Sequence, residues 1–250
     1  VSRSQPGGSL CRDLGSEGAL NACSNELKVP YEEGRINMKK LRGIIFDLDG
    51  VICSTDEYHY LAWKALAECM AIPFDRERNN LLRGVSRMES LEIILARGTK
   101  VYTEEEKIAF AEKKNMIYRS LLAQMSTSDL AEDVRNTLDV LKTSGIKLAI
   151  GSSSKNAPFI LDRIGLSTFF DAVADGNCIL RSKPDPEVFL LAASLLKLDP
   201  PECIVVEDAH AGVEAAVNGG FRCAAMGDAI DDERATWHLK RFADLLQIVA

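Results

Sequence analysis

The stretch GIIFDLDGVI, residues 43–52, decides the fold, because it begins as a strand and runs into two aspartates, Asp47 and Asp49. The β-branched and aromatic side chains of residues 44–46 are typical of a strand that is buried on both faces. A buried carboxylate is costly unless a charge or hydrogen bonds compensate it. The stretch therefore predicts a cationic partner at the end of this strand.

Downstream of this strand the sequence pattern changes twice. Only helical patterns follow at first, at residues 57–70, 89–98 and 103–125. Further on, helical segments at residues 130–145, 157–165, 186–197 and 211–220 alternate with strand-like segments at 146–152, 171–175, 203–208 and 222–226. Such alternation is typical of a parallel sheet covered by helices on both faces. We therefore expect an α/β fold with a doubly wound, Rossmann-like core and an inserted helical cap domain.

The predicted boundaries divide the chain into three parts. Residues 1–37 are polar and glycine-rich and show neither helical nor strand periodicity, so a disordered leader or non-native segment without function is expected there. Met38 opens a lead-in that is typical of a native start. The core is expected at residues 38–54 and 127–250, and the cap at 55–126.

Composition excludes several classes of partner. The 250 residues include 30 basic and 37 acidic side chains, a net charge of −7, which argues against nucleic acid or an anionic membrane as the partner. No apolar run approaches the roughly 20 residues that span a bilayer. The seven cysteines form no Cys-x-x-Cys pair, so we expect free thiols, with Cys203 and Cys223 buried. A monomer in the cytoplasm is expected.

Polar residues gather where the strands of the predicted sheet end. They are Asp47 and Asp49, Ser152, Ser153, Ser154 and Lys155, Lys183 ahead of the helix at 186–197, and Glu207 and Asp208. Ligands of open α/β sheets bind beyond the carboxyl ends of the strands. Carboxylate oxygens suit Mg²⁺, and hydroxyl and ammonium groups suit phosphoryl oxygens. The set therefore predicts a site for Mg²⁺ and phosphate.

Each of these segments also has a simpler explanation. DLDG resembles the start of a calcium loop, but Val51, Ile52 and Tyr58 stand at the third ligand, glycine and twelfth positions of that motif. SSSKN could serve only to cap a helix, Lys183 could be solvated, and Glu207 and Asp208 could form a capping turn. Their coincidence at one edge of one sheet favours a site.

The chemistry that such a site supports is phosphoryl transfer. An aspartate at a strand end can attack phosphorus and form an aspartyl-phosphate. Asp49, two residues after Asp47, can protonate a leaving oxygen or deprotonate an attacking hydroxyl. Mg²⁺ and Lys183 would offset the charge on the transferring group.

Four segments of the chain resemble the signature segments of the haloacid dehalogenase superfamily of phosphotransferases. They are DLDGV with the downstream Thr55, SSSKN, SKPDPEVF and EDAHAGVEAA, and the resemblance spans about residues 38–227. Further segments, among them RGVSRMESLEIIL and EKKNMIY, resemble the phosphoglucomutases of that superfamily. The resemblance implies an intramolecular phosphotransferase of the isomerase class that interconverts β-D-glucose 1-phosphate and D-glucose 6-phosphate. It also implies an aspartyl-phosphate enzyme, Mg²⁺, a small phosphorylated sugar as partner and a glucose 1,6-bisphosphate intermediate.

The resemblance also implies a role for individual residues. Asp47 would be the nucleophile and Asp49 the general acid and base. Mg²⁺ would be held by the Asp47 carboxylate, the Asp49 backbone carbonyl and Asp208, with Glu207 nearby. Ser152 and Lys183 would bind the transferring phosphate, and the distal phosphate would be bound by Arg87, Ser154, Lys155 and Asn156. The cap hinge and sugar site would comprise Thr55, His59, Trp63, Gly84, Val85, Ser86, Ser90 and Lys114.

Two of the cap residues can be weighed without the resemblance. Lys114 falls on the apolar stripe of a helix, where it could snorkel at the cap edge or contact substrate. His59 lies on a helix with apolar neighbours and could equally be a packed histidine. Three departures from the family pattern, at Ser54, Ala209 and residues 130–133, touch none of the reacting groups.

Other functions stay open at this point. A Mg²⁺-dependent sugar-phosphate or phosphoglycolate phosphatase would use the same groups, with water in place of the sugar hydroxyl. A dehalogenase would use the nucleophile without Mg²⁺, and Asp49 argues against it. A scaffold without activity is disfavoured because every reacting position is intact.

Overall fold

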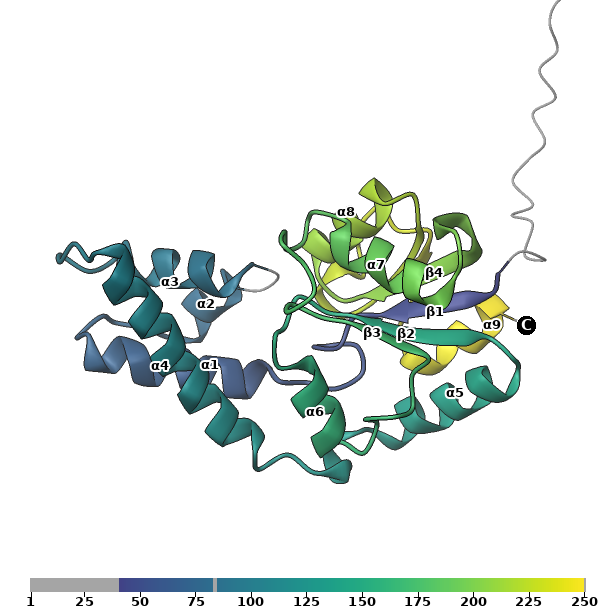
Figure 1. Cartoon of the computed structure of the whole chain (residues 1–250), viewed down its shortest axis with the longest axis horizontal. Coiled ribbons are helices and arrows are strands. Elements are labelled where there is room, and N and C mark those ends of the chain that lie inside the picture. The colour runs from purple at the N-terminus through teal and green to yellow at the C-terminus, as the bar shows by residue number, and fades with distance from the viewer. Residues whose placement is uncertain (1–40, 83–84, 250) are drawn as a thin grey trace, which may run out of the picture. The chain divides into compact units, whose positions relative to one another are not determined.

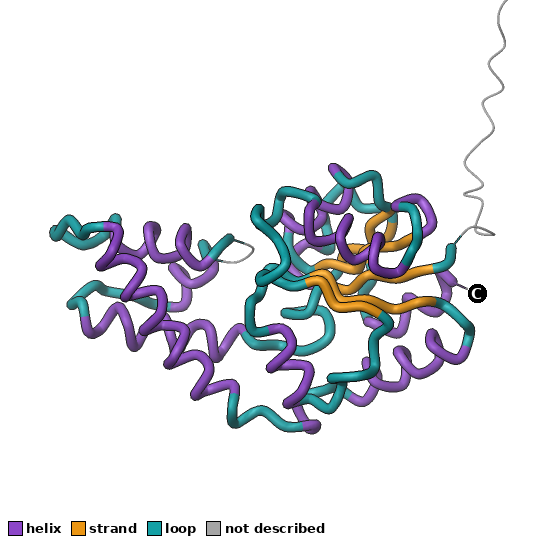
Figure 2. The backbone as a smooth tube through the Cα atoms, in the orientation of Figure 1, coloured by secondary structure: helices purple, strands orange, loops and turns teal. Residues whose placement is uncertain are grey.

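The computed structural model describes residues 41–82 and 85–249, which are built around a six-stranded parallel sheet of order β3-β2-β1-β4-β5-β6 (Figures 1 and 2). The strands are β1 (Gly43–Phe46), β2 (Lys147–Gly151), β3 (Ala172–Ala174), β4 (Cys203–Glu207), β5 (Arg222–Ala225) and β6 (Trp237–His238). Gly43 pairs with Lys147 of β2 on one side and with Cys203 of β4 on the other. The strand that carries the two aspartates is therefore central.

Alternation along β1 explains the two apolar layers of the core. Ile44 and Phe46 belong to one buried cluster, whereas Ile45 belongs to another on the opposite face. The first face is covered by α5 (Glu132–Thr143), α6 (Ala157–Arg163) and α9 (Leu245–Val249), and the second by α7 (Glu187–Leu196) and α8 (His210–Asn218). Figure 1 shows α7 and α8 on one side of the strands and α5 and α9 on the other. A sheet buried on both faces explains the continuously apolar strands.

In the described part of the chain, four helices follow β1 and precede α5: α1 (Asp56–Cys69), α2 (Arg76–Asn80), α3 (Arg87–Leu95) and α4 (Glu104–Leu122). Together they form the helical segment. They bury an apolar cluster of their own, which includes Trp63, Leu66 and Leu91. Helix α4 begins at a capping box, in which Thr103 and Glu106 satisfy backbone N–H groups of the first turn.

The predicted α/β fold is confirmed, including the helical stretch after the first strand. Cys203 and Cys223 are buried free thiols, as predicted. Helix α2 and strand β6 were not predicted, because five polar residues and a two-residue strand are too short to show a periodicity. None of the described helices is both long and apolar enough to cross a membrane. The division at residues 54 and 126 stays a prediction, and the predicted leader at 1–37 lies outside the described residues.

Gly151 of β2 leaves room for the Phe189 ring of α7. A Cβ atom at this position would lie 2.7 Å from Cδ1 of Phe189 and 3.0 Å from Cγ2 of Ile45. We predict that Gly151→Ala lowers the free energy of unfolding by about 1–3 kcal/mol, the usual cost of overpacking, as measured by urea unfolding. As a control, Phe189→Leu should cost less in the Gly151→Ala background than in the wild type. An equal cost in both backgrounds would contradict the steric explanation.

Candidate active site

The carboxyl ends of the strands face a cavity of about 980 Å³. From the core it is lined by the predicted residues Asp47, Asp49, Ser152, Ser154, Lys155, Asn156, Lys183, Glu207 and Asp208. From the helical segment it is lined by His59, Trp63, Val85, Ser86, Arg87, Ser90 and Lys114. These predicted residues of the two parts of the chain therefore meet in one cavity, whereas Thr55, also predicted, is buried and does not line it. Gly84 lies outside the described residues.

A tight turn after β1 positions the acidic residues. Gly50 adopts a φ of +83°, and its N–H donates to the Cys53 carbonyl at 2.8 Å. The carboxylate of Asp208 packs against this glycine, since a Cβ on Gly50 would lie 2.0 Å from Oδ2 of Asp208. Only glycine accepts both this φ and this close approach. The turn thus brings Asp208, which follows β4, beside Asp47 and Asp49.

Lys183 joins the ends of two neighbouring strands. Its Nζ donates to Oδ1 of Asp47 and to Oε1 of Glu207, and all three side chains are buried. The ammonium group also lies 4.6 Å from the centroid of the Phe189 ring. Although burial favours the neutral amine, the Asp47 and Glu207 carboxylates raise the pKa of Lys183 above its ordinary value. Lys183 is therefore a buried cation, as the two aspartates of the first strand required.

The second oxygen of Glu207 holds the loop that follows β4. Oε2 of Glu207 accepts hydrogen bonds from the backbone N–H groups of Asp208 and Ala209, both at 2.9 Å. Gly212 of α8 makes room for this carboxylate, because a Cβ there would lie 1.9 Å from Oε1. Glu207 therefore orients both Lys183 and the backbone of Asp208.

The carboxylates outnumber the cation that they surround. Burial raises the pKa of Asp47 well above its usual range, Lys183 opposes this, and Glu207 and Asp208 add to it. Burial, followed by the charge of Glu207, raises the pKa of Asp208 to about 7. In the part of the chain that the structure describes, no three acidic, histidine or cysteine side chains converge at metal-binding spacing. A cation that binds through few carboxylates and keeps several waters, as Mg²⁺ does, fits this donor set.

Asp49 is connected to the helical segment by a chain of hydroxyl groups. Thr55 Oγ1 donates to Oδ1 of Asp49, and the Tyr118 hydroxyl of α4 donates to Thr55 Oγ1 at 3.1 Å. Burial raises the pKa of Asp49 to about 6, although the hydrogen bond from Thr55 lowers it. A carboxyl group with this pKa can both give and take a proton near neutral pH.

Lys114 and His59 form a buried pair on the helical segment. The Nζ of Lys114 lies 3.0 Å from Nδ1 of His59 and over the rings of Trp63 and Tyr118, at 4.7 and 4.4 Å from their centroids. Burial, followed by Arg87, lowers the pKa of Lys114 to about 7. Burial, followed by Lys114, lowers the pKa of His59 well below its ordinary value. His59 is therefore neutral near pH 7, and its Nδ1 accepts the hydrogen bond from Lys114.

The loop after β2 presents hydroxyl and amide groups to the cavity. Ser152 Oγ accepts from the N–H of Ser154 at 3.1 Å, and Ser154 Oγ accepts from the N–H of Asn156 at 3.2 Å. Oγ of Ser153 is buried without a hydrogen-bond partner among the described residues. The buried Asn156 immediately precedes α6. The loop therefore offers several donors where an anion could bind.

The structure also shows contacts that the sequence did not predict. Tyr118 reaches Thr55, Phe189 lies beneath Lys183, and Asn115 and Arg119 contact Asn156. Tyr118 follows Lys114 by one helical turn, so the spacing could have indicated that both side chains lie on the same face of the helix. Ser86 acts as the N-cap of α3, where its Oγ accepts from the N–H of Glu89 at 3.3 Å.

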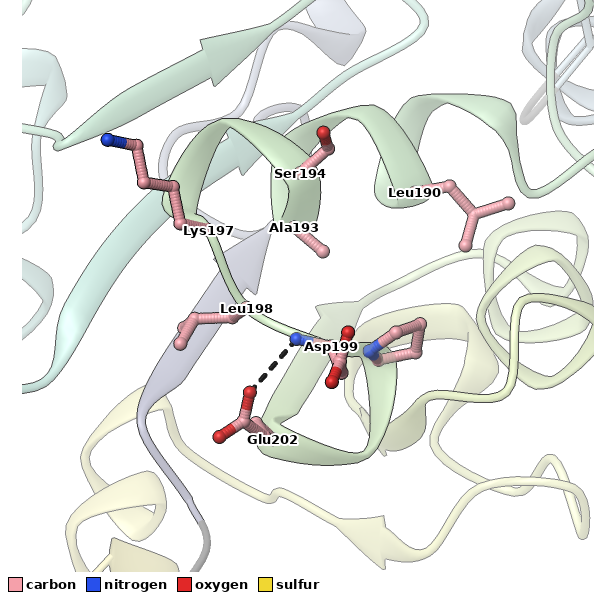
Figure 3. A pocket seen from close by; sticks show the side chains of 8 residues that line it. Leu190, Ala193, Ser194, Lys197, Leu198, Asp199 and Glu202 are labelled. Atoms are coloured by element: carbon pink, nitrogen blue, oxygen red, sulfur yellow. Dashed lines mark hydrogen bonds between the residues drawn. The ribbon is translucent and has the colours of Figure 1, made fainter.

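A second hollow, of about 390 Å³, lies near the amino end of β4, away from the carboxyl ends of the strands (Figure 3). It is formed by the end of α7 and the loop into β4, where the Asp199 N–H donates to Glu202 at 3.0 Å. Leu190 and Leu198 supply apolar side chains. None of the predicted site residues lines it, so the cavity at the carboxyl ends is the candidate active site.

Comparison with known proteins places these residues in a family. Residues 41–220 match the family model described as haloacid dehalogenase-like hydrolase. The chain belongs to this family. The predicted superfamily is therefore confirmed for most of the described chain.

The haloacid dehalogenase-like relatives include mutases and phosphatases. The chain is 44% identical over 190 residues to a β-phosphoglucomutase of Bacillus subtilis (strain 168), covering 75% of this chain and 84% of the relative. It is 30% identical over 199 residues to a phosphorylated carbohydrates phosphatase of Thermotoga maritima, covering 78% and 89%. A crystal structure of β-phosphoglucomutase from Clostridium difficile superposes with a TM-score of 0.77 at 39% identity, covering 82% of this chain and 93% of that one. The relatives favour the predicted phosphotransferase activity and, within it, the mutase.

The low pKa of Lys114 predicts a pH-dependent gain in stability when the lysine is removed. Below pH 7 the folded protein must bury a charged ammonium group, which lowers its stability. From pH 7 to 10.5 the unfolded chain binds more protons than the folded one, so the stability of the wild type rises with pH. Lys114→Met should therefore raise the free energy of unfolding by about 2–4 kcal/mol below pH 7, and the gain should shrink as the pH rises towards 10. Urea unfolding over this pH range measures it.

The neighbouring exposed lysine provides the control for this experiment. Lys113→Met should leave the shape of the stability–pH curve unchanged, since Lys113 is exposed on the same helix. A Lys114→Met gain of constant size across the pH range would contradict the assignment.

Proposed function

We propose that the chain is a β-phosphoglucomutase that interconverts β-D-glucose 1-phosphate and D-glucose 6-phosphate through glucose 1,6-bisphosphate. One observation carries this proposal: a single cavity is lined both by the Asp47–Lys183 cluster and by a second set of hydrogen-bond donors, around Arg87 and Asn156, that is suited to another phosphate group. A bisphosphate needs two such groups of donors, whereas hydrolysis of a monophosphate needs one. The mutase relatives support the same reaction.

Asp47 is the proposed nucleophile. In one direction an oxygen of Asp47 bonds to a phosphorus atom of the bisphosphate, and the bond between that phosphorus and the sugar oxygen breaks. The sugar oxygen takes a proton from Asp49 and leaves as a hydroxyl group. In the other direction Asp49 removes the proton from a sugar hydroxyl, which attacks the aspartyl-phosphate and restores the Asp47 carboxylate. Isomerisation follows when the two directions use different hydroxyl groups of the sugar.

The surroundings of Asp49 suit this double role. Its pKa of about 6, raised by burial, makes both protonation states accessible near neutral pH. The Thr55 hydroxyl, itself held by Tyr118, fixes the position of the carboxyl group. Tyr118 and Lys114 lie on α4, and Thr55 immediately precedes α1. The helical segment therefore positions Asp49, the proposed general acid and base.

Phosphotransferases of this family generally use Mg²⁺. The Asp47 and Asp208 carboxylates and the Asp49 backbone carbonyl would hold the ion, with Glu207 nearby orienting Lys183. When bound, Mg²⁺ offsets the negative charge of the transferring phosphoryl group. The excess of carboxylates over cations in this cluster supports the assignment.

The remaining side chains bind the two phosphates and the sugar. Lys183 and Ser152 are proposed to bind the transferring phosphate, and the distal phosphate is assigned to Arg87, Ser154, Lys155 and Asn156. The sugar and cap-closure positions are assigned to Thr55, His59, Trp63, Gly84, Val85, Ser86, Ser90 and Lys114. A small phosphorylated sugar is therefore the proposed partner, while the monomeric state and the cytoplasmic location stay predictions.

A sugar-phosphate phosphatase is the alternative, and one of the relatives bears that description. The two activities share Asp47, Asp49 and Lys183 and differ in whether water reaches the aspartyl-phosphate. The half-buried Arg87 favours the mutase, because it adds a cationic group on the helical segment beyond what a monophosphate requires.

The proposal is tested by following two products at once. Purified protein is mixed with Mg²⁺, β-glucose 1-phosphate and a trace of glucose 1,6-bisphosphate, and glucose 6-phosphate and free phosphate are measured in parallel. We expect glucose 6-phosphate to accumulate without matching phosphate release. Asp47→Asn, prepared in the same way, should form neither product and so controls for contaminating enzymes. Phosphate release without isomerisation would establish the phosphatase instead.

A further inference from the structure

Four polar side chains form a continuous chain of hydrogen bonds at the edge of the cavity. Oδ1 of Asn115 accepts from Nη2 of Arg87 at 3.1 Å and from Nδ2 of Asn156 at 3.0 Å. Oδ1 of Asn156 in turn accepts from Nη1 of Arg119 at 3.2 Å. Asn115 and Arg119 lie on α4, one helical turn apart, whereas Asn156 immediately precedes α6. The chain of bonds therefore ties the helical segment to the core.

The two arginines determine how both amide groups are oriented. A guanidinium group has donors only, so the atom that faces it must be an amide oxygen. Arg87 therefore fixes the oxygen of Asn115, and Arg119 fixes the oxygen of Asn156. The NH₂ group of Asn156 therefore points towards Asn115, and both asparagines line the cavity.

Arg119 is itself held in place from the core side. Its guanidinium carbon lies 4.6 Å from the centroid of the Phe159 ring of α6. Asn156 is only 4% exposed, so its carboxamide has little freedom to reorganise. Stacking on the ring and donation to Asn156 together specify the position of the Arg119 head group.

We propose that Asn115 and Arg119 are positioning residues for the distal phosphate, an inference that rests on the proposed function. Phosphate oxygens only accept hydrogen bonds, so Asn156 can bind them only through its NH₂ group. Arg119 prevents the Asn156 amide from turning its oxygen towards the phosphate. Oδ1 of Asn115 accepts from both Arg87 and Asn156 and so holds their donor groups close together. A phosphate oxygen can accept from two donors at that spacing.

The test measures binding of the second phosphate separately from chemistry at Asp47. Acetyl phosphate serves as a phosphoryl donor that lacks a distal phosphate, and glucose 1,6-bisphosphate is added as an inhibitor of its hydrolysis. Arg119→Met retains an apolar stem over Phe159 but removes the donor to Asn156. We expect inhibition by the bisphosphate to weaken about tenfold, with acetyl phosphate hydrolysis within about twofold of the wild type. Arg119→Lys, which retains a donor, should recover part of the loss.

Arg135→Met is the matched control for Arg119→Met. Arg135 also stacks on a phenylalanine, at 5.4 Å from the Phe169 centroid, but it lies on α5 and donates to Asp139, which does not line the cavity. This variant should bind the bisphosphate as the wild type does. Inhibition by the bisphosphate that is equally strong in Arg119→Met and Arg135→Met would overturn the role of Arg119.

Asn115→Asp tests the second positioning residue without changing its shape. The new carboxylate keeps an acceptor between Arg87 and Asn156 but repels a phosphate, so inhibition by the bisphosphate should weaken about tenfold or more. Gln124→Glu adds the same charge at an exposed position just beyond α4 and should leave inhibition unchanged. If Asn115→Asp lost acetyl phosphate hydrolysis as well as inhibition by the bisphosphate, Asn115 would be merely structural.

This experiment and the test of the proposed function can fail independently. The proposed function fails when the wild type forms no glucose 6-phosphate, whichever result the variants give. The positioning role fails when the variants bind the bisphosphate normally, whether or not the wild type isomerises sugars. Calorimetric titration with glucose 1,6-bisphosphate gives the same comparison where acetyl phosphate hydrolysis is too slow to follow.

Discussion

The structure depends above all on the buried ion pairs of Lys183. One ammonium group satisfies the carboxylates at the ends of the central strand and of its neighbour, Asp47 and Glu207. Removing one partner from such a buried cluster typically costs about 3–5 kcal/mol, because the remaining charges have no compensation. Glu207 also accepts the backbone N–H groups that position Asp208. The same contacts that make a charged strand end tolerable in the core thus bring together the proposed reacting groups.

The helical segment adds what the strand ends lack. It supplies Tyr118, which holds Thr55 against Asp49, and the buried pair of Lys114 and His59. Each of these groups loses solvation when it is buried, and each finds a hydrogen-bond or ring contact within the segment or with the core. Because these contacts replace the lost solvation, the polar groups can line a cavity that excludes water from an aspartyl-phosphate. This requirement separates a mutase from a phosphatase built from the same strand-end residues.

The sequence was sufficient for five of the six strands of the sheet and for the residues at its carboxyl edge. Alternation of strands and helices, together with charged residues after apolar runs, was enough to place Asp47, Ser152, Lys183, Glu207 and Asp208 together. The contacts between distant segments could not be predicted in this way. Arg119 and Asn156 are separated by 37 positions and occupy ordinary helical and loop contexts, so only the folded structure reveals their contact. Phe189 beneath Lys183 was hidden for the same reason, since a phenylalanine on a helix predicts only burial.

The most direct test of the role of Asp47 at the strand end is to locate the phosphoryl group on the protein. The enzyme is mixed with Mg²⁺ and acetyl phosphate, quenched in acid within the first turnover and digested, and the modified peptide is identified by mass spectrometry. If the strand-end cluster acts as described, the phosphoryl group is found on Asp47 and is lost when sugar phosphate is added before the quench. A phosphoryl group on Asp49 or Ser152, or turnover without any phosphorylated peptide, would contradict the assignment of Asp47 as the nucleophile.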